Sequence, residues 1–286
     1  MKYPFKNLVF KGGGVLGVAY QGAYEVLHEQ KILPAIEKVC GTSTGAISAL
    51  LIGLGYPPKE SREVLIHLDF KSLQDGGWTG IFRLFKQYGW FKGDAFLNLF
   101  KTLCAEKTGN PAITFRDLHK KDRIQVFFTG TNISKLNSQV FCYEHTPDLP
   151  LAEAVRMSIS VPYYFASRTY QGDIFVDGGV LEDYAISLFD QADRTASKAE
   201  TLGFYLNYHA KPIKIHNFIS FVEGMLHTQS NQQLNALQEH PEDLARTVFI
   251  DTLGISVLDF KLNQEQKLEL MEQGRKATEA YLEKYM

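Results

Sequence analysis

The chain has 286 residues, 45% of them hydrophobic, and a formal net charge of -2. This length is enough to bury one large core, or one core with a small cap. The charge balance gives no overall field that would attract nucleic acid, so no nucleic-acid partner is expected. Residues 1–6 lack the apolar run of a signal peptide, and no stretch has the apolar length of a membrane span. A cytoplasmic protein is therefore the default expectation, and export as an effector without a cleaved signal stays open.

The three cysteines are Cys40, Cys104 and Cys142, an odd number without metal-ligand spacing. This pattern is typical of reduced thiols in an intracellular protein. We therefore expect no metal site, and nothing in the composition requires a cofactor.

The first sixty residues alternate between strand and helix patterns. Residues 7–10 predict a short buried strand that ends at three glycines, and residues 15–30 carry helical periodicity. A second strand is expected at Val39 and Cys40, and a second helix over residues 44–54. Such a β-α-β-α order indicates a parallel sheet covered by helices.

Aromatic and basic residues alternate between residues 76 and 103. The aromatic residues are Trp78, Phe82, Phe85, Tyr88, Trp90, Phe91, Phe96 and Phe100, and Arg83, Lys86, Lys92 and Lys101 lie among them. Ordinary packing is the commoner origin of such a segment. Aromatic and basic faces also suit a lid over an apolar pocket or reversible contact with a membrane surface through residues 78–100, and the sequence leaves both interpretations open.

The rest of the chain contains further strands and three helices. Strands are expected at residues 124–131, 139–143, 173–176, 202–205 and 247–250, and helices at 151–157, 217–237 and 264–285. Asn263 and Gln266 are placed as a capping box for the last helix. Without an internal repeat or a low-complexity linker, we expect one domain over residues 1–286, with a core at about 7–210 and a C-terminal helical part at about 211–286.

A serine lies between two glycines directly after the second expected strand. The sequence Gly41-Thr42-Ser43-Thr44-Gly45 is a G-x-S-x-G pentapeptide on a strand-to-helix turn. In such an elbow the glycines avoid collisions in a tight turn, and strained backbone exposes the serine hydroxyl. The following helix also adds positive potential at its N-terminus. Ser43 is therefore a candidate nucleophile.

The glycines after the first strand form a second motif. Residues 12–17, Gly-Gly-Gly-Val-Leu-Gly, fit G-x-G-x-x-G, but a dinucleotide site also needs an acidic residue at the end of the second strand. Glu37 lies at the wrong end of that strand. Converging backbone N–H groups at a helix N-terminus favour an oxyanion hole instead, formed by Gly12, Gly13 and Gly14.

A serine nucleophile needs a base within hydrogen-bond reach. His209, His216, His227 and His240 lie late enough for the order Ser-Asp-His, but each is placed in a polar stretch or an expected helix. Too few strands precede the elbow for an α/β-hydrolase. Asp177 ends an apolar strand before Gly178 and Gly179, and in an open parallel sheet ligands bind at the carboxyl ends of the strands. Burial beside an apolar pocket would raise the pKa of this carboxyl towards that of a useful base.

These motifs together resemble the patatin-like phospholipase family. The glycine loop from Gly12 to Gly17, the elbow from Gly41 to Gly45 and the triplet Asp177-Gly178-Gly179 match its oxyanion, nucleophile and aspartate motifs. The segment from Ser158 to Pro162 also resembles its S-x-S-x-P segment. The similarity covers residues 7 to about 186 with the motifs in the right order.

The resemblance implies a three-layer α/β/α sandwich with a mainly parallel central sheet and a Ser43–Asp177 dyad. It also implies hydrolysis of lipid acyl esters. Two positions depart from the family pattern: Leu16 replaces a frequent basic residue, and Asp183-Tyr184-Ala185 replaces N-x-P. The first departure would remove a basic contact to a phosphate head group, and the second would alter the shape of the loop and the substrate range.

The expected function is that of a phospholipase A or lysophospholipase acting on lipid or phospholipid through a Ser43 acyl-enzyme, with Asp177 as base. Acyl transfer to an acceptor other than water is an alternative on the same dyad. A non-catalytic lipid-binding protein is a second alternative, and a nucleotide-binding module a more distant one. The oligomeric state, head group and acyl-chain preference are left open by the sequence.

Overall fold

The computed structural model describes residues 3–121, 124–190, 198–207 and 212–285. Its strands are β1 (Asn7–Phe10), β2 (Lys38–Thr42), β3 (Gly89–Phe91), β4 (Gln125–Asn132), β5 (Asn137–Phe141), β6 (Tyr163–Phe165), β7 (Arg168–Tyr170), β8 (Asp173–Asp177), β9 (Thr201–Asn207) and β10 (Thr247–Asp251). Its helices are α1 (Tyr20–Glu29), α2 (Thr44–Leu54), α3 (Pro58–His67), α4 (Gly80–Gln87), α5 (Asp94–Thr108), α6 (Phe115–His119), α7 (Leu151–Ser158), α9 (Phe218–Gln238), α10 (Pro241–Ala245) and α11 (Gln264–Leu282). Short 3-10 helices include η1 (Gly14–Ala19) and η5 (Gly178–Val180).

The central sheet is mainly parallel, as expected. Its strand order is β10-β9-β1-β2-β4-β8-β7, and β5 pairs with β4 outside this row. The strands from β10 to β4 run parallel, whereas β5 and β8 are antiparallel to β4, and β7 is antiparallel to β8. The strands expected at residues 124–131 and 139–143 are therefore present as the β4–β5 hairpin.

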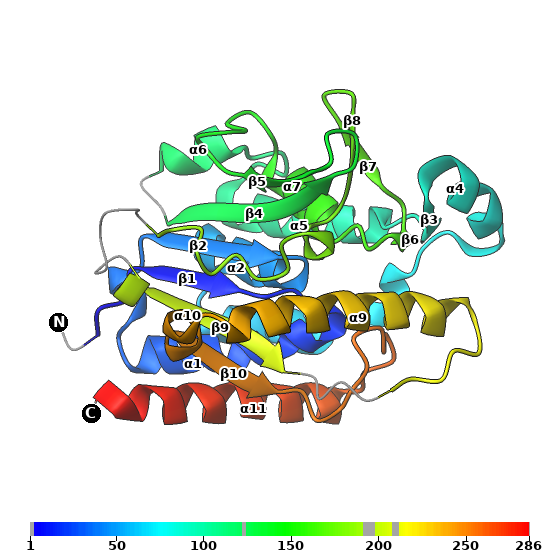
Figure 1. Ribbon diagram of the computed structural model, residues 1–286. Helices are drawn as coiled ribbons and strands as arrows, with labels where there is room; N and C mark the ends of the chain where they lie inside the picture. Colours follow the sequence, from blue (N-terminus) through cyan, green and yellow to red (C-terminus); the bar gives the residue numbers. More distant parts are fainter. Residues whose placement is uncertain (1–2, 122–123, 191–197, 208–211, 286) are drawn as a thin grey trace.

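Helices cover both faces of the sheet (Figure 1). Alternate strand residues such as Leu8 and Phe10 enter the larger core with α1, α2, α5, α7 and α11. Val9, between them on β1, and its pairing partner Cys40 on β2 enter a smaller core with Leu237 of α9. This alternation follows from the two-residue period of a strand. The arrangement is the predicted three-layer α/β/α sandwich.

The direction of β8 corrects one step of the sequence analysis. We expected Asp177 at the carboxyl end of a parallel strand, but β8 runs antiparallel to β4. Residues 175–177 pair with residues 130–132 at the carboxyl end of β4. Since Thr129 of β4 pairs with Thr42 of β2, Asp177 still ends beside the elbow. β8 therefore brings Asp177 to the carboxyl end of β4 while running in the opposite direction to β4.

The aromatic segment after residue 76 divides into two environments. Phe96 and Phe100 of α5 are buried in the core, which agrees with ordinary packing. Phe82 and Phe85 of α4 are 72% and 78% exposed. The short strand β3, which follows α4, pairs with β6, and neither strand was predicted. The side chain of Trp78 lies outside the described part of the chain.

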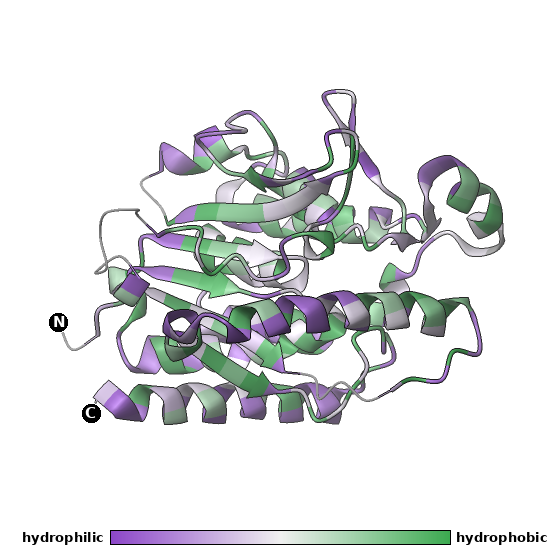
Figure 2. Ribbon diagram, viewed as in Figure 1, coloured by the Kyte–Doolittle hydropathy of each residue, from purple (hydrophilic) through white to green (hydrophobic). Residues whose placement is uncertain are grey.

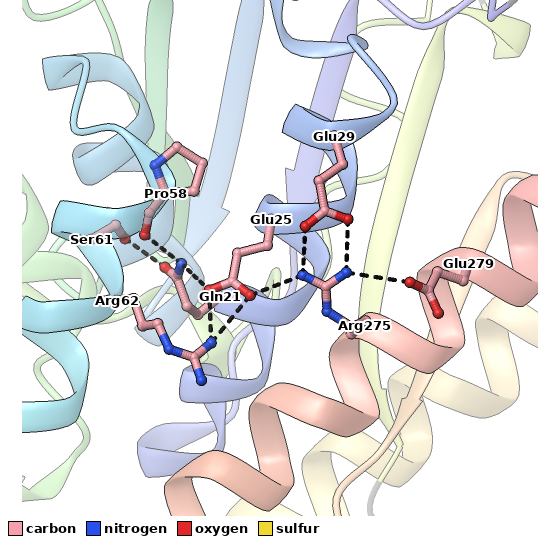
Figure 3. A network of polar contacts seen from close by, with 8 residues as sticks. All are labelled: Gln21, Glu25, Glu29, Pro58, Ser61, Arg62, Arg275 and Glu279. Atoms are coloured by element: carbon pink, nitrogen blue, oxygen red, sulfur yellow. Dashed lines mark hydrogen bonds and ion pairs between the residues drawn. The ribbon is translucent and has the colours of Figure 1, made fainter.

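The C-terminal helix α11 packs along α1. Arg275 of α11 binds Glu25 and Glu29 of α1, and Arg62 of α3 also binds Glu25 (Figure 3). The predicted capping box of Asn263 and Gln266 is present.

We propose that the whole chain forms one domain, because β9 and β10 extend the central sheet and α11 covers it.

Within the described ranges, each helix is too short or too polar to cross a bilayer.

The three cysteines are buried and form no disulfide. Burial raises the pKa of the Cys142 thiol to about 11.

Candidate active site

Ser43 lies between β2 and α2 in a strained backbone conformation, with φ of 51° and ψ of -118°. A Cβ on Gly41 would lie 2.1 Å from the carbonyl oxygen of Gly45, and one on Gly45 would lie 2.2 Å from that of Phe10. Side chains at these positions would therefore collide with backbone, which is the reason that the sequence motif suggested. Positive φ values at non-glycine residues are costly and concentrate at functional sites.

The side chains of Ser43 and Asp177 are in direct contact. Ser43 Oγ donates a hydrogen bond of 2.7 Å to Asp177 Oδ2. Asp177 Oδ1 accepts a 2.7 Å bond from the Gly179 N–H, which fixes the plane of the carboxylate. The structure thus brings together two residues that the sequence analysis paired.

Burial controls the protonation of Asp177, which is 4% exposed. Removal from water raises the pKa of this carboxyl from 3.8 to about 7, against the lowering effect of the bonds from Ser43 and Gly179. Asp183 raises the pKa further and Lys11 lowers it. A carboxyl with a pKa near 7 suits a general base at neutral pH.

The segment after α7 holds both members of the pair. Ser158 Oγ accepts a 2.9 Å hydrogen bond from the Ser43 N–H, and the Asp177 N–H donates a 2.9 Å bond to the Ser160 carbonyl. Both serines are buried. This S-x-S-x-P segment therefore positions the nucleophile and the carboxylate relative to each other.

Ser158→Ala is expected to destabilise the fold by about 1–3 kcal/mol, because the buried Ser43 N–H loses its partner. A shift of the elbow would also lower kcat for ester hydrolysis by about ten- to hundredfold. Ser61→Ala is a matched control, since Ser61 is also buried but bonds Gln21 on α1. Urea unfolding and kcat, measured for both variants, should show loss of stability in each and loss of kcat in Ser158→Ala alone. Equal kcat values in the two variants would contradict a positioning role for Ser158.

The glycine loop leaves two amides available next to Ser43. The Gly12 N–H donates to the Asp183 carbonyl (3.0 Å) and the Val15 N–H to the Val257 carbonyl (3.1 Å). Among the described residues, the N–H groups of Gly13 and Gly14 have no hydrogen-bond partner. Gly14 has φ of 58°, and a Cβ there would lie 2.0 Å from Val257 O.

The remaining motif glycines allow close packing around these residues. A Cβ on Gly17 would lie 2.0 Å from Thr44 Oγ1, and one on Gly178 would lie 2.3 Å from Thr129 Oγ1. Gly17 thus lets η1 approach the first turn of α2. Gly178 lets the turn after Asp177 approach β4.

A buried ion pair that the sequence analysis missed adjoins the dyad. Lys11 Nζ lies 2.5 Å from Asp183 Oδ2 and donates to the Gly12 carbonyl (3.0 Å). The Asp183 N–H donates to Gln233 of α9 (2.8 Å). Asp183, noted in the sequence as a departure from the family pattern, therefore ties the glycine loop to α9. The signal for Lys11 was a lysine directly after an apolar strand and before three glycines.

Arg156 of α7 is a second residue that was missed. Its buried guanidinium donates to the carbonyls of Lys92, Gly93 and Ala166 and to Ser160 Oγ. Burial lowers the pKa of Arg156 to about 10. These bonds hold the segment before α5 and the serine segment together below the site.

Three cavities at or beside the dyad share lining residues. Ser43, Asp177, Gly13 and Gly14 line a catalytic cavity of about 60 Å³. A cavity of about 40 Å³ shares Ser43 with it and is walled by Phe70, Phe96, Phe165 and Phe260. An apolar cavity of about 410 Å³ shares Leu226 and Gln229 of α9 with the catalytic cavity. Its lining also includes Val176 and Val180, next to Asp177 and Gly179.

The described histidines do not contact Ser43. His216 and His240 are exposed, and His227 lies on α9 beside Glu223. His209 lies outside the described residues. The hydrogen-bond partner of Ser43 Oγ is Asp177.

Comparisons with known proteins place the chain in a family. A sequence model described as patatin-like phospholipase matches residues 8–190. The uncharacterized protein YqhO of Bacillus subtilis is 30% identical, and the match covers 97% of this chain and 98% of that protein. The "Probable lipid hydrolase 463L" of Invertebrate iridescent virus 6 is 27% identical over 64% of this chain and 63% of its own length. The crystal structure of VipD from Legionella pneumophila has the same fold, with a TM-score of 0.68 at 16% identity, over 98% of this chain and 67% of VipD. The chain therefore belongs to the patatin-like phospholipase family, a membership that supports lipid hydrolase activity.

Proposed function

We propose that this protein is a lipid acyl hydrolase of the phospholipase A or lysophospholipase type, with Ser43 as nucleophile and Asp177 as base. The observation that carries the proposal is the 2.7 Å hydrogen bond from Ser43 Oγ to Asp177 Oδ2. Family membership supports the coarser assignment to lipid hydrolases. The apolar cavities beside the dyad support a substrate with hydrocarbon chains.

In the first half of the reaction, Ser43 Oγ attacks the carbonyl carbon of the ester and its proton passes to Asp177 Oδ2. The negative charge then develops on the former carbonyl oxygen. We assign its stabilisation to the N–H groups of Gly13 and Gly14, because the Gly12 N–H is already bonded to Asp183 O. Collapse of this intermediate breaks the bond to the alcohol, which leaves with the proton from Asp177.

In the second half, water attacks the acyl group on Ser43. Asp177 takes a proton from this water, a second tetrahedral intermediate forms, and the proton returns to Ser43 Oγ as the fatty acid leaves. The same carboxyl thus acts as base and acid in turn, for which a pKa near the working pH is favourable.

A fluorophosphonate probe tests the proposal, because it phosphonylates an activated serine. The probe is expected to label Ser43, identified by peptide mass spectrometry, and Ser43→Ala should remain unlabelled. Labelling requires the ionised carboxylate, so its rate should rise with pH through about 7 and then level off. Absence of labelling in the folded wild-type protein would favour the non-catalytic lipid-binding alternative.

A further inference from the structure

An apolar surface lies on α4 and around the start of α9. Its members are the exposed residues Ile81, Phe82, Phe85, Tyr88, Ile213, Ile215, Phe218, Ile219, Phe221 and Met225, which we call the apolar rim. Figure 2 places α4 and the N-terminal end of α9 on the same side of the molecule. Trp90 of β3 joins the two parts, because its carbonyl accepts a bond from Arg83 of α4 and its ring centroid lies 6.5 Å from that of Phe218. A contiguous exposed patch of this kind marks an interaction site.

At three positions α4 shows the reverse of the burial expected for an ordinary surface helix. Of its two charged residues, Lys86 is exposed, but Arg83 is buried and bonds Gly76 O, Thr79 Oγ1 and Trp90 O, whereas Phe82 and Phe85 face outward. A helix on a globular core would bury the phenylalanines and expose the arginine. The bonds of Arg83 therefore fix α4 with its apolar face towards the surroundings.

The apolar rim lies at the mouth of the 410 Å³ cavity. Tyr88 and Met225 belong to both the rim and the lining of this cavity. From there, Leu226 and Gln229 form the boundary with the catalytic cavity. An apolar molecule that enters at the rim would therefore lie against mainly apolar side chains as far as Gln229, which also lines the catalytic cavity.

The charge around the rim is mainly positive, and the one nearby acidic residue within the rim segments, Glu223, is half-buried and accepts a hydrogen bond from Ser256. Residues 76–93 and 212–222 contain no aspartate or glutamate. Lys86, Lys92 and Lys214 in these segments are exposed. Apolar side chains flanked by lysines complement a layer of lipids with anionic head groups, where both kinds of contact are satisfied together.

We propose that the apolar rim docks on an anionic lipid surface, so that substrate passes from the lipid layer into the 410 Å³ cavity. The proposal rests on the proposed lipid hydrolase function for its substrate, but the docking itself is independent of turnover. Phe82 and Phe85 insert among the acyl chains, and Lys86 and Lys214 contact the anionic head groups.

Sedimentation with vesicles tests the docking of the full chain. Vesicles of phosphatidylcholine with phosphatidylglycerol are compared with vesicles of phosphatidylcholine alone. The double variant Phe82→Asp/Phe85→Asp is expected to bind the mixed vesicles at least tenfold more weakly, because two phenylalanine side chains would no longer be buried among the acyl chains. For Lys86→Glu/Lys214→Glu, the ratio of binding to the mixed vesicles over binding to phosphatidylcholine vesicles should fall at least tenfold.

Leu268→Asp is the control, because Leu268 is 38% exposed on α11, which packs along α1 and contributes no residue to the rim. It should bind vesicles as the wild type does, and all variants should keep hydrolysis of a soluble p-nitrophenyl ester. Wild-type binding by Phe82→Asp/Phe85→Asp would overturn the proposal. The proposal would also be overturned if the wild type formed a dimer, the variant dissociated this dimer, and vesicle binding persisted. The rim would then bind a second copy of the chain. Failure of Ser43 labelling would overturn the proposed function and leave the vesicle result unaffected.

Discussion

Ser43→Ala is expected to lower kcat for hydrolysis of a short p-nitrophenyl ester by about 10⁴- to 10⁶-fold, the range found when a serine nucleophile or its base is removed. The variant keeps the glycine loop and the cavities but cannot form the acyl-enzyme. The small substrate reports on the chemistry alone, because it does not depend on a lipid surface. Initial rates at pH 8, where Asp177 is mostly ionised, give the comparison with the wild type.

Asp177→Asn should produce a loss of similar size, because an amide cannot accept the proton of Ser43. Asp173→Asn is its matched control. Asp173 begins the same strand and pairs with Lys135, away from Ser43. This control should keep wild-type kcat, and circular dichroism should show the same fold for all three variants.

Two results would contradict the dyad. Substantial activity in Ser43→Ala would place the nucleophile elsewhere. Substantial activity in Asp177→Asn would require another base, and replacement of His209 and His227 would then be the next experiment.

The elbow and the glycine loop could be predicted from the sequence because their constraints are local. Gly41 avoids a contact with backbone inside the elbow, Gly45 avoids one with the neighbouring strand β1 just before the glycine loop, and β1 and α2 begin and end at the predicted residues. A short apolar segment between turn residues also predicted the strand that carries Asp177. Its direction could not be predicted, because the two-residue alternation of a strand is the same for parallel and antiparallel pairing.

Side chains that support the dyad were harder to predict. The bonds from Lys11 to Asp183, from Ser158 to Ser43 and from Arg156 to the segment before α5 join parts of the chain that only the fold brings together. Single-residue patterns do not encode such distant pairs. The aromatic segment after residue 76 was ambiguous for a related reason, since burial of Phe96 and exposure of Phe82 depend on tertiary packing.

Asp177→Asn is also expected to stabilise the protein above pH 7, and this second result tests the burial of the carboxylate independently of catalysis. The folded protein holds the Asp177 proton up to about pH 7, whereas the group has a pKa of 3.8 before burial. Between these pH values the folded state binds more protons than the unfolded state, so the free energy of unfolding falls as pH rises. At pH 8 the buried carboxylate costs on the order of 2–4 kcal/mol, from 1.36 kcal/mol per pKa unit.

Asparagine carries no charge at any pH and can keep the bond from the Gly179 N–H through its carbonyl oxygen. Urea unfolding should therefore show Asp177→Asn as more stable than the wild type at pH 8, with the difference vanishing near pH 4. Asp173→Asn supplies the opposite sign, because hydrogen bonds from Lys135 and Asn132 lower the pKa of Asp173, so its ionised form stabilises the fold above pH 4. Equal stability of Asp177→Asn and the wild type at pH 8 would mean that the carboxylate is solvated. Ser43 would then lack a base with a pKa near neutrality, because burial is what raises the pKa of Asp177.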